Sequence, residues 1–151
     1  MAEELIPTVR RIYDAMARWD VETLSHSVTH DFELNLPDCV PFGGTRHGYD
    51  GVEAFATLFR DYIDGPWAEP DDFLDADDAL VVLGRLRGTG KRTGQAFEVP
   101  FAHVWTFNEG APSRCRAYYD TAPVTAAIEP VGAPGERPPS VVRDRSASRR
   151  R

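Results

Sequence analysis

The sequence predicts an α+β domain in which three N-terminal helices pack on a curved antiparallel sheet. Helical hydrophobic periodicity is concentrated in the first 65 residues, and alternating apolar segments separated by glycine-containing turns follow between residues 80 and 120. Helices followed by consecutive hairpin strands favour this class over a parallel βαβ sheet. A length of 151 residues with 42% hydrophobic residues is sufficient for one domain with its own core.

Three segments have the apolar spacing of amphipathic helices. In the first, the stripe runs from Leu5 to Met16. Asp20 is expected to cap the second, and Asp50 with Glu53 three residues later has the pattern of a capping box at the start of the third. The third helix is expected to stop at the Gly65-Pro66 pair. We therefore predict helices at residues 5–16, 21–27 and 50–65.

Four segments have the alternation of half-buried strands. The first ends at Pro37 and is followed by a loop rich in proline and glycine that reaches Gly48. The acidic stretch 69–78 is interpreted as a solvated loop rather than a calcium site, because it lacks the central glycine of a calcium loop. The strands are expected at residues 32–36, 80–87, 95–107 and 114–120.

The charge is distributed unevenly along the chain. Residues 1–128 carry 11 basic and 21 acidic side chains, whereas residues 129–151 carry six arginines and three acids. An acidic body argues against binding of nucleic acid, and the proline- and arginine-rich segment 129–151 is expected to be a flexible tail. No long apolar segment predicts a membrane span or a secretory signal, and two cysteines make a disulfide framework improbable, so we expect a cytoplasmic protein.

Three local sequences carry a resemblance to a known family. They are the first-helix sequence 10–15 (RRIYDA), the strand sequence 97–105 (FEVPFAHVW) and the last-strand sequence 116–122 (RAYYDTA). With the order of elements, they resemble the nuclear transport factor 2-like superfamily, in its SnoaL-like and ketosteroid-isomerase-related branch, over about residues 5–128. The resemblance implies a cone-shaped α+β barrel around a pocket, and a homodimer formed through the sheet.

The catalytic residues of that superfamily do not transfer directly to this chain. The oxyanion-hole aspartate of the steroid isomerases falls on His103, their helix tyrosine falls on Ile12 beside Tyr13, and their aspartate base falls on Leu36. The last-strand aspartate of SnoaL-type cyclases falls on Ala117, and the arginine–aspartate pair of epoxide hydrolases falls on Phe101 and His103. These departures argue against ketosteroid isomerisation and against epoxide hydrolysis by the known residues.

Four residues are candidates for catalysis. Strand alternation places His103 on one face with two aromatic residues, where desolvation should lower its pKa and leave a neutral imidazole as an acid or base. Tyr119 and Tyr13 could supply hydroxyls that stabilise an oxyanion. Asp120 could orient His103, or could instead cap the turn that follows it. For each, a purely structural role remains the alternative.

A second set of residues could bind substrate. Asn35 contributes a polar anchor only if it, and not the adjacent leucines, faces the interior, which the period alone does not decide. The remaining members are aromatic side chains and one cysteine, with Trp67 a further candidate. The candidate substrate-binding residues are Trp19, Asn35, Phe55, Phe59, Phe101, Trp105 and Cys115.

These features predict a cofactor-independent enzyme that isomerises, cyclises or dehydrates an apolar polyketide- or terpenoid-like compound by acid–base chemistry. The alternative is a non-catalytic module of the same fold that binds a small molecule or dimerises. We expect no cofactor, because no nucleotide-binding motif occurs, and no metal, because His26 and His30 lack a third nearby histidine.

Overall fold

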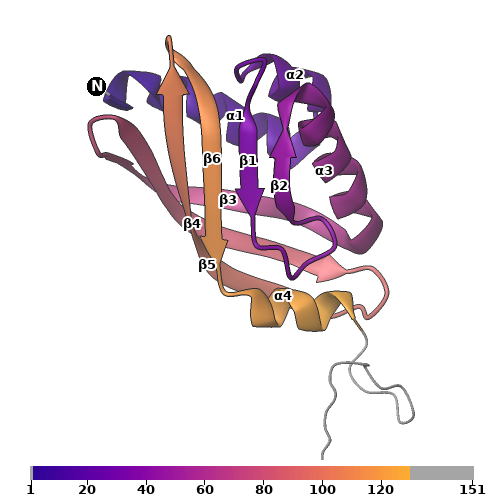
Figure 1. Ribbon diagram of the computed structural model, residues 1–151. Coiled ribbons are helices and arrows are strands. Elements are labelled where there is room, and N and C mark those ends of the chain that lie inside the picture. Colours follow the sequence, from indigo (N-terminus) through magenta and orange to yellow (C-terminus); the bar gives the residue numbers. More distant parts are fainter. Residues whose placement is uncertain (1, 130–151) are drawn as a thin grey trace, which may run out of the picture.

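A computed structural model describes residues 2–129, in which helices cover the concave face of a curved, six-stranded sheet (Figure 1). The architecture is the expected α+β class. In chain order the elements are the 3₁₀ turn η1 (Ala2–Leu5), α1 (Ile6–Arg18), α2 (Val21–His26), β1 (Glu33–Leu36), β2 (Gly44–His47), α3 (Gly48–Tyr62), β3 (Ile63–Asp75), β4 (Ala79–Gly90), β5 (Ala96–Asn108), β6 (Ala111–Tyr119) and α4 (Thr121–Ile128).

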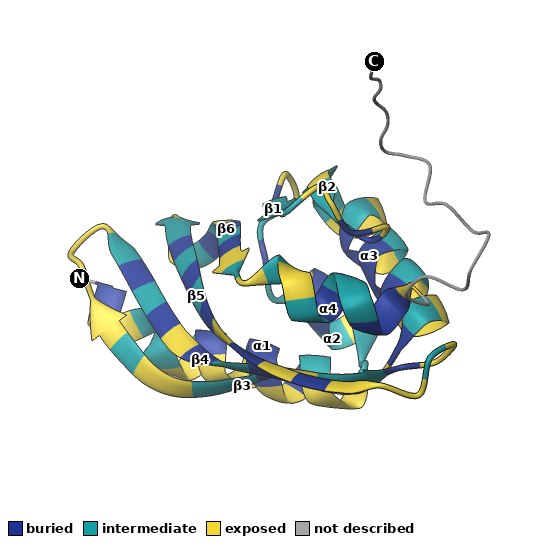
Figure 2. Ribbon diagram, turned by 90° about the horizontal axis from the view of Figure 1, so that it is seen from below, coloured by how far each residue is buried: buried dark blue, intermediate teal, exposed yellow. Residues whose placement is uncertain are grey.

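The sheet has the strand order β2-β1-β6-β5-β4-β3. The four long strands β3 to β6 form antiparallel hairpins, as predicted. Strand β1 pairs with β6 in parallel, so the prediction of a wholly antiparallel sheet is wrong at this pair. Register shifts in β3 near Trp67 and Asp72 add local twist. Burial alternates along β4 and β5, which gives the sheet one inner face and one outer face (Figure 2).

Helix α1 places an apolar stripe against the sheet because its buried residues recur at helical spacing. They are Val9, Ile12, Tyr13 and Ala15. Asp20 caps α2 as predicted, since its side chain accepts a hydrogen bond from the Thr23 amide at 3.2 Å. The inner face of the sheet and the helices thus meet in a single apolar core.

The predicted boundaries of the third helix are wrong at both ends. Helix α3 begins at Gly48, its N-cap is His47, and no side chain caps it, so Asp50 and Glu53 do not form a capping box. The helix ends at Tyr62 because Ile63 is already extended and starts β3, three residues before Pro66. The chain passes directly from helix to strand, and the Gly65-Pro66 pair lies inside the strand.

Three elements were not expected from the sequence. The loop 37–48 contains β2, and the acidic stretch forms much of β3 rather than a solvated loop. Strand β3 lies at the edge of the sheet, where charged residues and proline are tolerated because one side of the backbone remains unpaired. Helix α4 follows Asp120, where only a turn was predicted. The predicted tail, from residue 130 onward, lies outside the described residues.

Among the described residues, no helix combines the length and the apolar character needed to cross a membrane.

Candidate active-site cavity

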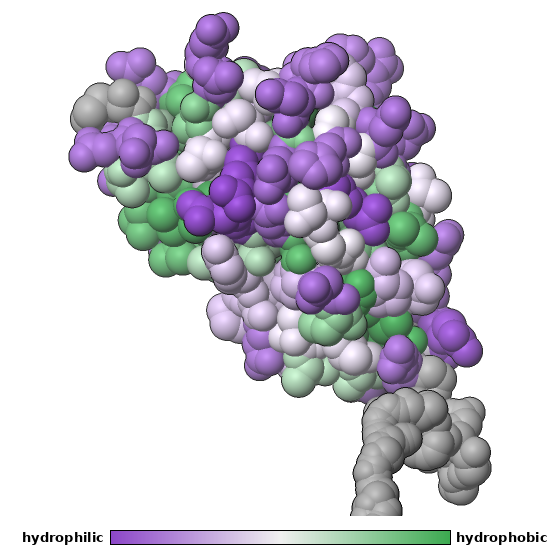
Figure 3. Space-filling view, in the orientation of Figure 1, coloured by the Kyte–Doolittle hydropathy of each residue, from purple (hydrophilic) through white to green (hydrophobic). Residues whose placement is uncertain are grey.

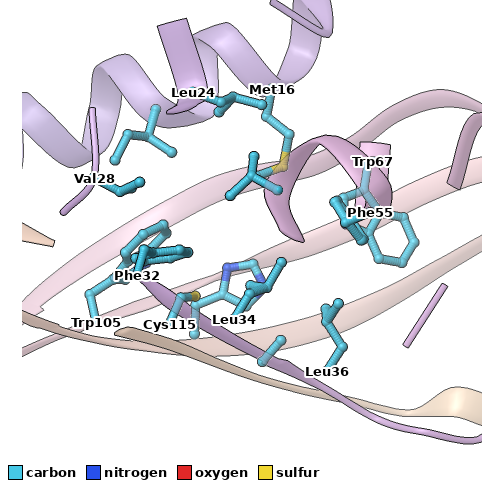
Figure 4. Close-up of a pocket in the computed structure, with 14 residues that line it drawn as sticks. Met16, Leu24, Val28, Phe32, Leu34, Leu36, Phe55, Trp67, Trp105 and Cys115 are labelled. Carbon is cyan, nitrogen blue, oxygen red and sulfur yellow. The ribbon is translucent and has the colours of Figure 1, made fainter. Parts of the chain in front are cut away.

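An apolar cavity lies between the helices and the inner face of the sheet (Figure 4). The space that the centre of a water molecule can occupy in it is about 50 Å³, which is more than a single water needs. Within the described residues, His103 is the only lining residue with an ionisable group other than the thiol of Cys115. The lining residues are Ile12, Met16, Leu24, Val28, Phe32, Leu34, Leu36, Val52, Phe55, Trp67, His103, Trp105, Cys115 and Ala117.

His103 is positioned by a chain of buried hydrogen bonds. The Nε1 of Trp105 donates to the Tyr13 hydroxyl oxygen at 3.1 Å, and that oxygen lies 2.6 Å from His103 Nδ1. An indole N–H can only donate, so the Tyr13 oxygen is its acceptor. The only acceptor that the described residues offer to the hydroxyl hydrogen of Tyr13 is Nδ1, so Tyr13 donates to Nδ1. We therefore assign the proton of the neutral imidazole to Nε2, which is the ring nitrogen left for a ligand.

Burial determines the charge of this group. His103 is 5% exposed, and burial lowers its pKa from 6.5 to about 3. Burial also raises the pKa of Tyr13 well above its usual value, with smaller effects from Cys115 and the Trp105 hydrogen bond. Both groups are consequently neutral at pH 7. A neutral His103 ring has one N–H that can donate, and its low pKa makes it a weak base.

Aromatic rings hold His103 in place. The His103 ring stacks on Phe101 with centroids 4.0 Å apart, and it lies nearly parallel to the Tyr13 ring at 5.8 Å. Phe101 does not line the cavity but supports His103 from the side. The stack on Phe101 and the hydrogen bond from Tyr13 restrict rotation of the imidazole, so the Nε2–H direction is fixed before a ligand binds.

Several predicted substrate-binding residues converge on this cavity, and others lie beside it. Phe55, Trp105 and Cys115 line it, as does the further candidate Trp67. Burial raises the pKa of the Cys115 thiol, which therefore stays protonated and contributes shape rather than a nucleophile. Trp19 and Phe59 instead pack against each other with ring centroids 4.9 Å apart, in the aromatic cluster next to the cavity.

Asn35 is a correction to the sequence prediction. Leu34 and Leu36 line the cavity, so Asn35 faces the outer side of the sheet. There its side chain donates to Glu33 at 2.9 Å and accepts from Arg114 at 2.7 Å. Asn35 is thus part of an outer polar cluster and does not face a ligand in the cavity.

Asp120 is a second correction. Its side chain accepts a hydrogen bond from the Ala122 amide at 3.3 Å and forms the N-cap of α4. It is exposed, and the partner of His103 is Tyr13 rather than a carboxylate. The capping alternative considered for Asp120 is therefore the one that the structure supports.

Tyr119 lies behind the cavity rather than in its wall. Its ring contacts Trp67 edge-on with centroids 5.6 Å apart, and its hydroxyl is buried without a hydrogen-bond partner among the described residues. Burial raises the pKa of Tyr119, and the nearby Cys39 adds to this effect. Of the four catalytic candidates, His103 and Tyr13 are in contact with each other, whereas Tyr119 and Asp120 lie elsewhere.

Sequence reasoning missed much of the cavity wall. Met16, Leu24, Val28 and Phe32 line it, although their spacing marks them only as buried. Residues on helix and strand faces that pack against the same sheet surface surround the same space. The apolar faces of the first two helices and of the strands could therefore have predicted these wall residues. Within residues 2–129, no group of three or more metal-ligating side chains is close enough to hold a metal ion.

Comparison with known families agrees with this geometry. The model of the SnoaL-like domain matches residues 9–114. The chain belongs to the SnoaL-like family. Among curated proteins, none matches this SnoaL-like chain.

Solved structures of the same fold extend the comparison. An NTF2-like protein of unknown function from Burkholderia pseudomallei is 31% identical with a TM-score of 0.76, and the match covers 82% of this chain and 96% of that one. TerC, co-crystallized with polyporic acid, is 25% identical with a TM-score of 0.75 and coverages of 82% and 97%. A protein from Jannaschia sp. CCS1, whose name proposes a SnoaL-like polyketide cyclase, is 21% identical with a TM-score of 0.67 and coverages of 83% and 92%, which shows the fold alone.

Proposed function

We propose that this SnoaL-like protein is a cofactor-independent enzyme that isomerises or cyclises an apolar carbonyl compound in its cavity. The observation that carries the proposal is the Trp105–Tyr13–His103 chain, which presents one oriented N–H in an otherwise apolar space. A neutral imidazole can polarise a carbonyl oxygen and stabilise the oxyanion of an enolate.

The raised pKa of Tyr13 favours a hydrogen bond from His103 over full transfer of the Nε2 proton. Complete transfer of the Nε2 proton, followed by uptake of the Tyr13 proton at Nδ1, would leave a buried phenolate, and burial disfavours that charge. A hydrogen bond to the developing oxyanion avoids this cost. In an apolar site, such a donor typically contributes about 10²–10³ in rate.

The apolar wall indicates the substrate class. A cavity lined by aromatic and aliphatic groups with one polar donor fits a small hydrophobic compound that carries an oxygen acceptor. TerC was crystallised with polyporic acid, and its match covers most of both chains. This similarity supports an oxygenated organic ligand for this chain.

Binding without chemistry is the second candidate function. No carboxylate is among the lining residues in the described part of the chain, so the cavity itself supplies no strong base. A protein that only holds a ligand by apolar contact and one hydrogen bond needs nothing more than this arrangement.

Cyclohexanone in D₂O distinguishes the two functions. On binding, its carbonyl stretch in the infrared should move to lower wavenumber because His103 donates to the oxygen. Because the cavity wall supplies no strong base, deuteroxide or the buffer base takes the α-hydrogen, and an enzyme that stabilises the resulting enolate should accelerate exchange of the α-hydrogens for deuterium, measured by proton NMR. A shifted carbonyl without accelerated exchange would support the binding module instead.

His103→Asn is the matched variant for this experiment. Asparagine keeps an acceptor near the Nδ1 position for Tyr13 but removes the Nε2–H. We expect the infrared shift to disappear and the exchange rate to fall about 10²–10³-fold, with the melting temperature little changed. If the carbonyl stretch of cyclohexanone shifts in the variant by as much as in the wild type, the role of His103 is overturned.

A further inference from the structure

Three pairs of residues follow one another along the inner face of β5 and β6. In order along the strands, the pairs are Trp105–Cys115, His103–Ala117 and Phe101–Tyr119. Successive pairs contain residues two apart in sequence, so they form rows separated by about 6.5 Å. His103 therefore lies in the middle row, with one row on each side of it.

The row that contains Trp105 belongs to an aromatic end of the cavity. The rings of Phe32 and Trp105 have centroids 6.3 Å apart, and both residues line the cavity. The indole N–H of Trp105 is already donated to Tyr13. A ligand that reaches this end consequently meets aromatic surface.

A second aromatic end lies on the other side of His103. The Trp67 ring contacts the Tyr119 ring with centroids 5.6 Å apart, which places Trp67 beside the row of Tyr119. Phe42 packs against Phe55 at 6.1 Å and against Trp67 at 5.9 Å, so these two residues belong to one cluster. Both Phe55 and Trp67 line the cavity.

The two aromatic ends are separate. Figure 4 shows Phe32 and Trp105 at one end of the cavity, and Phe55 and Trp67 at the other. The rows next to these ends are about 13 Å apart along the strands, because two row spacings separate them. His103 lies in the row between them. Its oriented Nε2–H therefore meets a ligand between two apolar ends.

The polarity of β1 and β6 is consistent with this arrangement. Hydrophilic residues gather on the outer surface over the middle of these two strands (Figure 3). Asn35 accepts a hydrogen bond from Arg114 there, at 2.7 Å. Leu34 and Leu36 alternate with Asn35 and line the cavity. A ligand in the cavity thus meets the apolar side of these strands.

We propose that the cavity selects a compound whose carbonyl group is internal, with an apolar group on each side of it. The carbonyl oxygen accepts from His103 Nε2, one arm of the compound lies against Phe32 and Trp105, and the other lies against Phe55 and Trp67. A carbonyl near the end of a chain leaves one of these ends unfilled, which forfeits apolar burial. This inference deepens the proposed function, since it rests on the same cavity and donor and names the substrate class.

Dipropyl ketone and methyl pentyl ketone are the probes, because they are isomers that differ only in the position of the carbonyl along the chain. We expect dipropyl ketone to bind the full-length protein about tenfold more tightly by calorimetry, since its two arms reach both ends at once. Its carbonyl stretch should also shift further on binding. Equal affinities, a preference for methyl pentyl ketone, or no binding of either ketone would overturn the proposal.

Phenylalanine variants assign the preference to the two ends. Phe32→Leu and Phe55→Leu each enlarge one end, so a pentyl arm fits there while the carbonyl stays at His103. In each variant the preference for dipropyl ketone should fall about threefold or more. Phe107→Leu is the matched control, because Phe107 is partly buried but does not line the cavity, and it should keep the preference. A preference unchanged in both cavity variants would contradict the assignment.

His103 anchors the carbonyl between the two ends. In His103→Asn, either isomer can slide along the cavity until its chain fills both ends, so most of the preference for dipropyl ketone should disappear. A full preference in this variant would show that the position of the carbonyl is not read by His103, and would overturn the proposal.

The result is separable from the test of the proposed function. If exchange of cyclohexanone is not accelerated but dipropyl ketone is preferred, the protein binds such ketones without chemistry, and the inference about the ligand stands. If cyclohexanone is polarised and exchanged while the two isomers bind equally, this inference alone fails.

Discussion

His103 differs from a surface histidine because it is buried in an apolar layer and its Nδ1 accepts a hydrogen bond from Tyr13. A solvated imidazole gains a proton near neutral pH, but here burial lowers the pKa to about 3. The same burial that prevents the ring from acting as a strong base strengthens it as a neutral donor, since no water competes for its Nε2–H.

The lowered pKa has a consequence for stability. Between pH 6.5 and about 3, the unfolded chain binds a proton at His103 that the folded ring does not bind. The free energy of unfolding should therefore decrease as the pH falls through this window, by up to about 1.4 kcal/mol per pH unit from this group. Above pH 6.5 the group contributes no slope.

Urea denaturation at several pH values between about 4 and 7 measures this dependence. His103→Asn lacks the titrating group, so its unfolding free energy should fall less steeply with decreasing pH than that of the wild type. Parallel curves for the two proteins would show that the imidazole does not stay neutral in the folded state.

At the level of elements, the starts of two helices depend on single polar side chains. Asp20 caps α2 and Asp120 caps α4, and in both the carboxylate accepts from a backbone amide of the first turn. Helix α4 has buried Val124, Ala127 and Ile128 and continues directly from β6, so its start is coupled to a strand that lines the cavity.

Asp120→Ala should lower the stability by about 1 kcal/mol through loss of this cap. Asp120→Asn keeps an acceptor and should lower it less. Neither variant should change the rate of deuterium exchange in cyclohexanone, because Asp120 does not contact His103. Loss of exchange at unchanged stability in Asp120→Ala would instead assign it the catalytic role considered from the sequence.

At the level of the molecule, the outer face of the sheet carries an exposed apolar row. The register places Leu83 opposite Ala102 and Ala102 opposite Tyr118, and Tyr118 is 54% exposed. Exposed apolar groups side by side on a sheet favour association. The homodimer implied by the family resemblance therefore remains a prediction, with this row as its expected contact.

Sedimentation velocity tests the dimer. The wild type should sediment as a dimer and Tyr118→Glu as a monomer with an unchanged circular dichroism spectrum, because a charge in this row would be buried without a partner. Arg92→Gln, in the exposed β4–β5 turn, should remain dimeric. A monomeric wild type at high concentration would contradict the prediction.

The sequence by itself determined the α+β class, the strands β4 and β5, and the face of β5 that carries His103 and Trp105. These depend on local periodicity and turn residues, which a short window contains. It also indicated the burial of His103, because an imidazole between two alternating aromatic positions faces the same side as they do.

Only the tertiary structure decided the partner of His103, the orientation of Asn35, and the existence of β2, β3 and α4. Tyr13 and His103 are 90 residues apart, so their hydrogen bond depends on how α1 lies across the sheet. The sequence of β3 is acidic and predicts a loop. Pairing with β4 along its length supplies partners for its backbone N–H and C=O groups and makes it a strand. The physical reason is the same for each of these features: where the local conformational preference of the sequence is weak, long-range strand pairing and packing determine the structure.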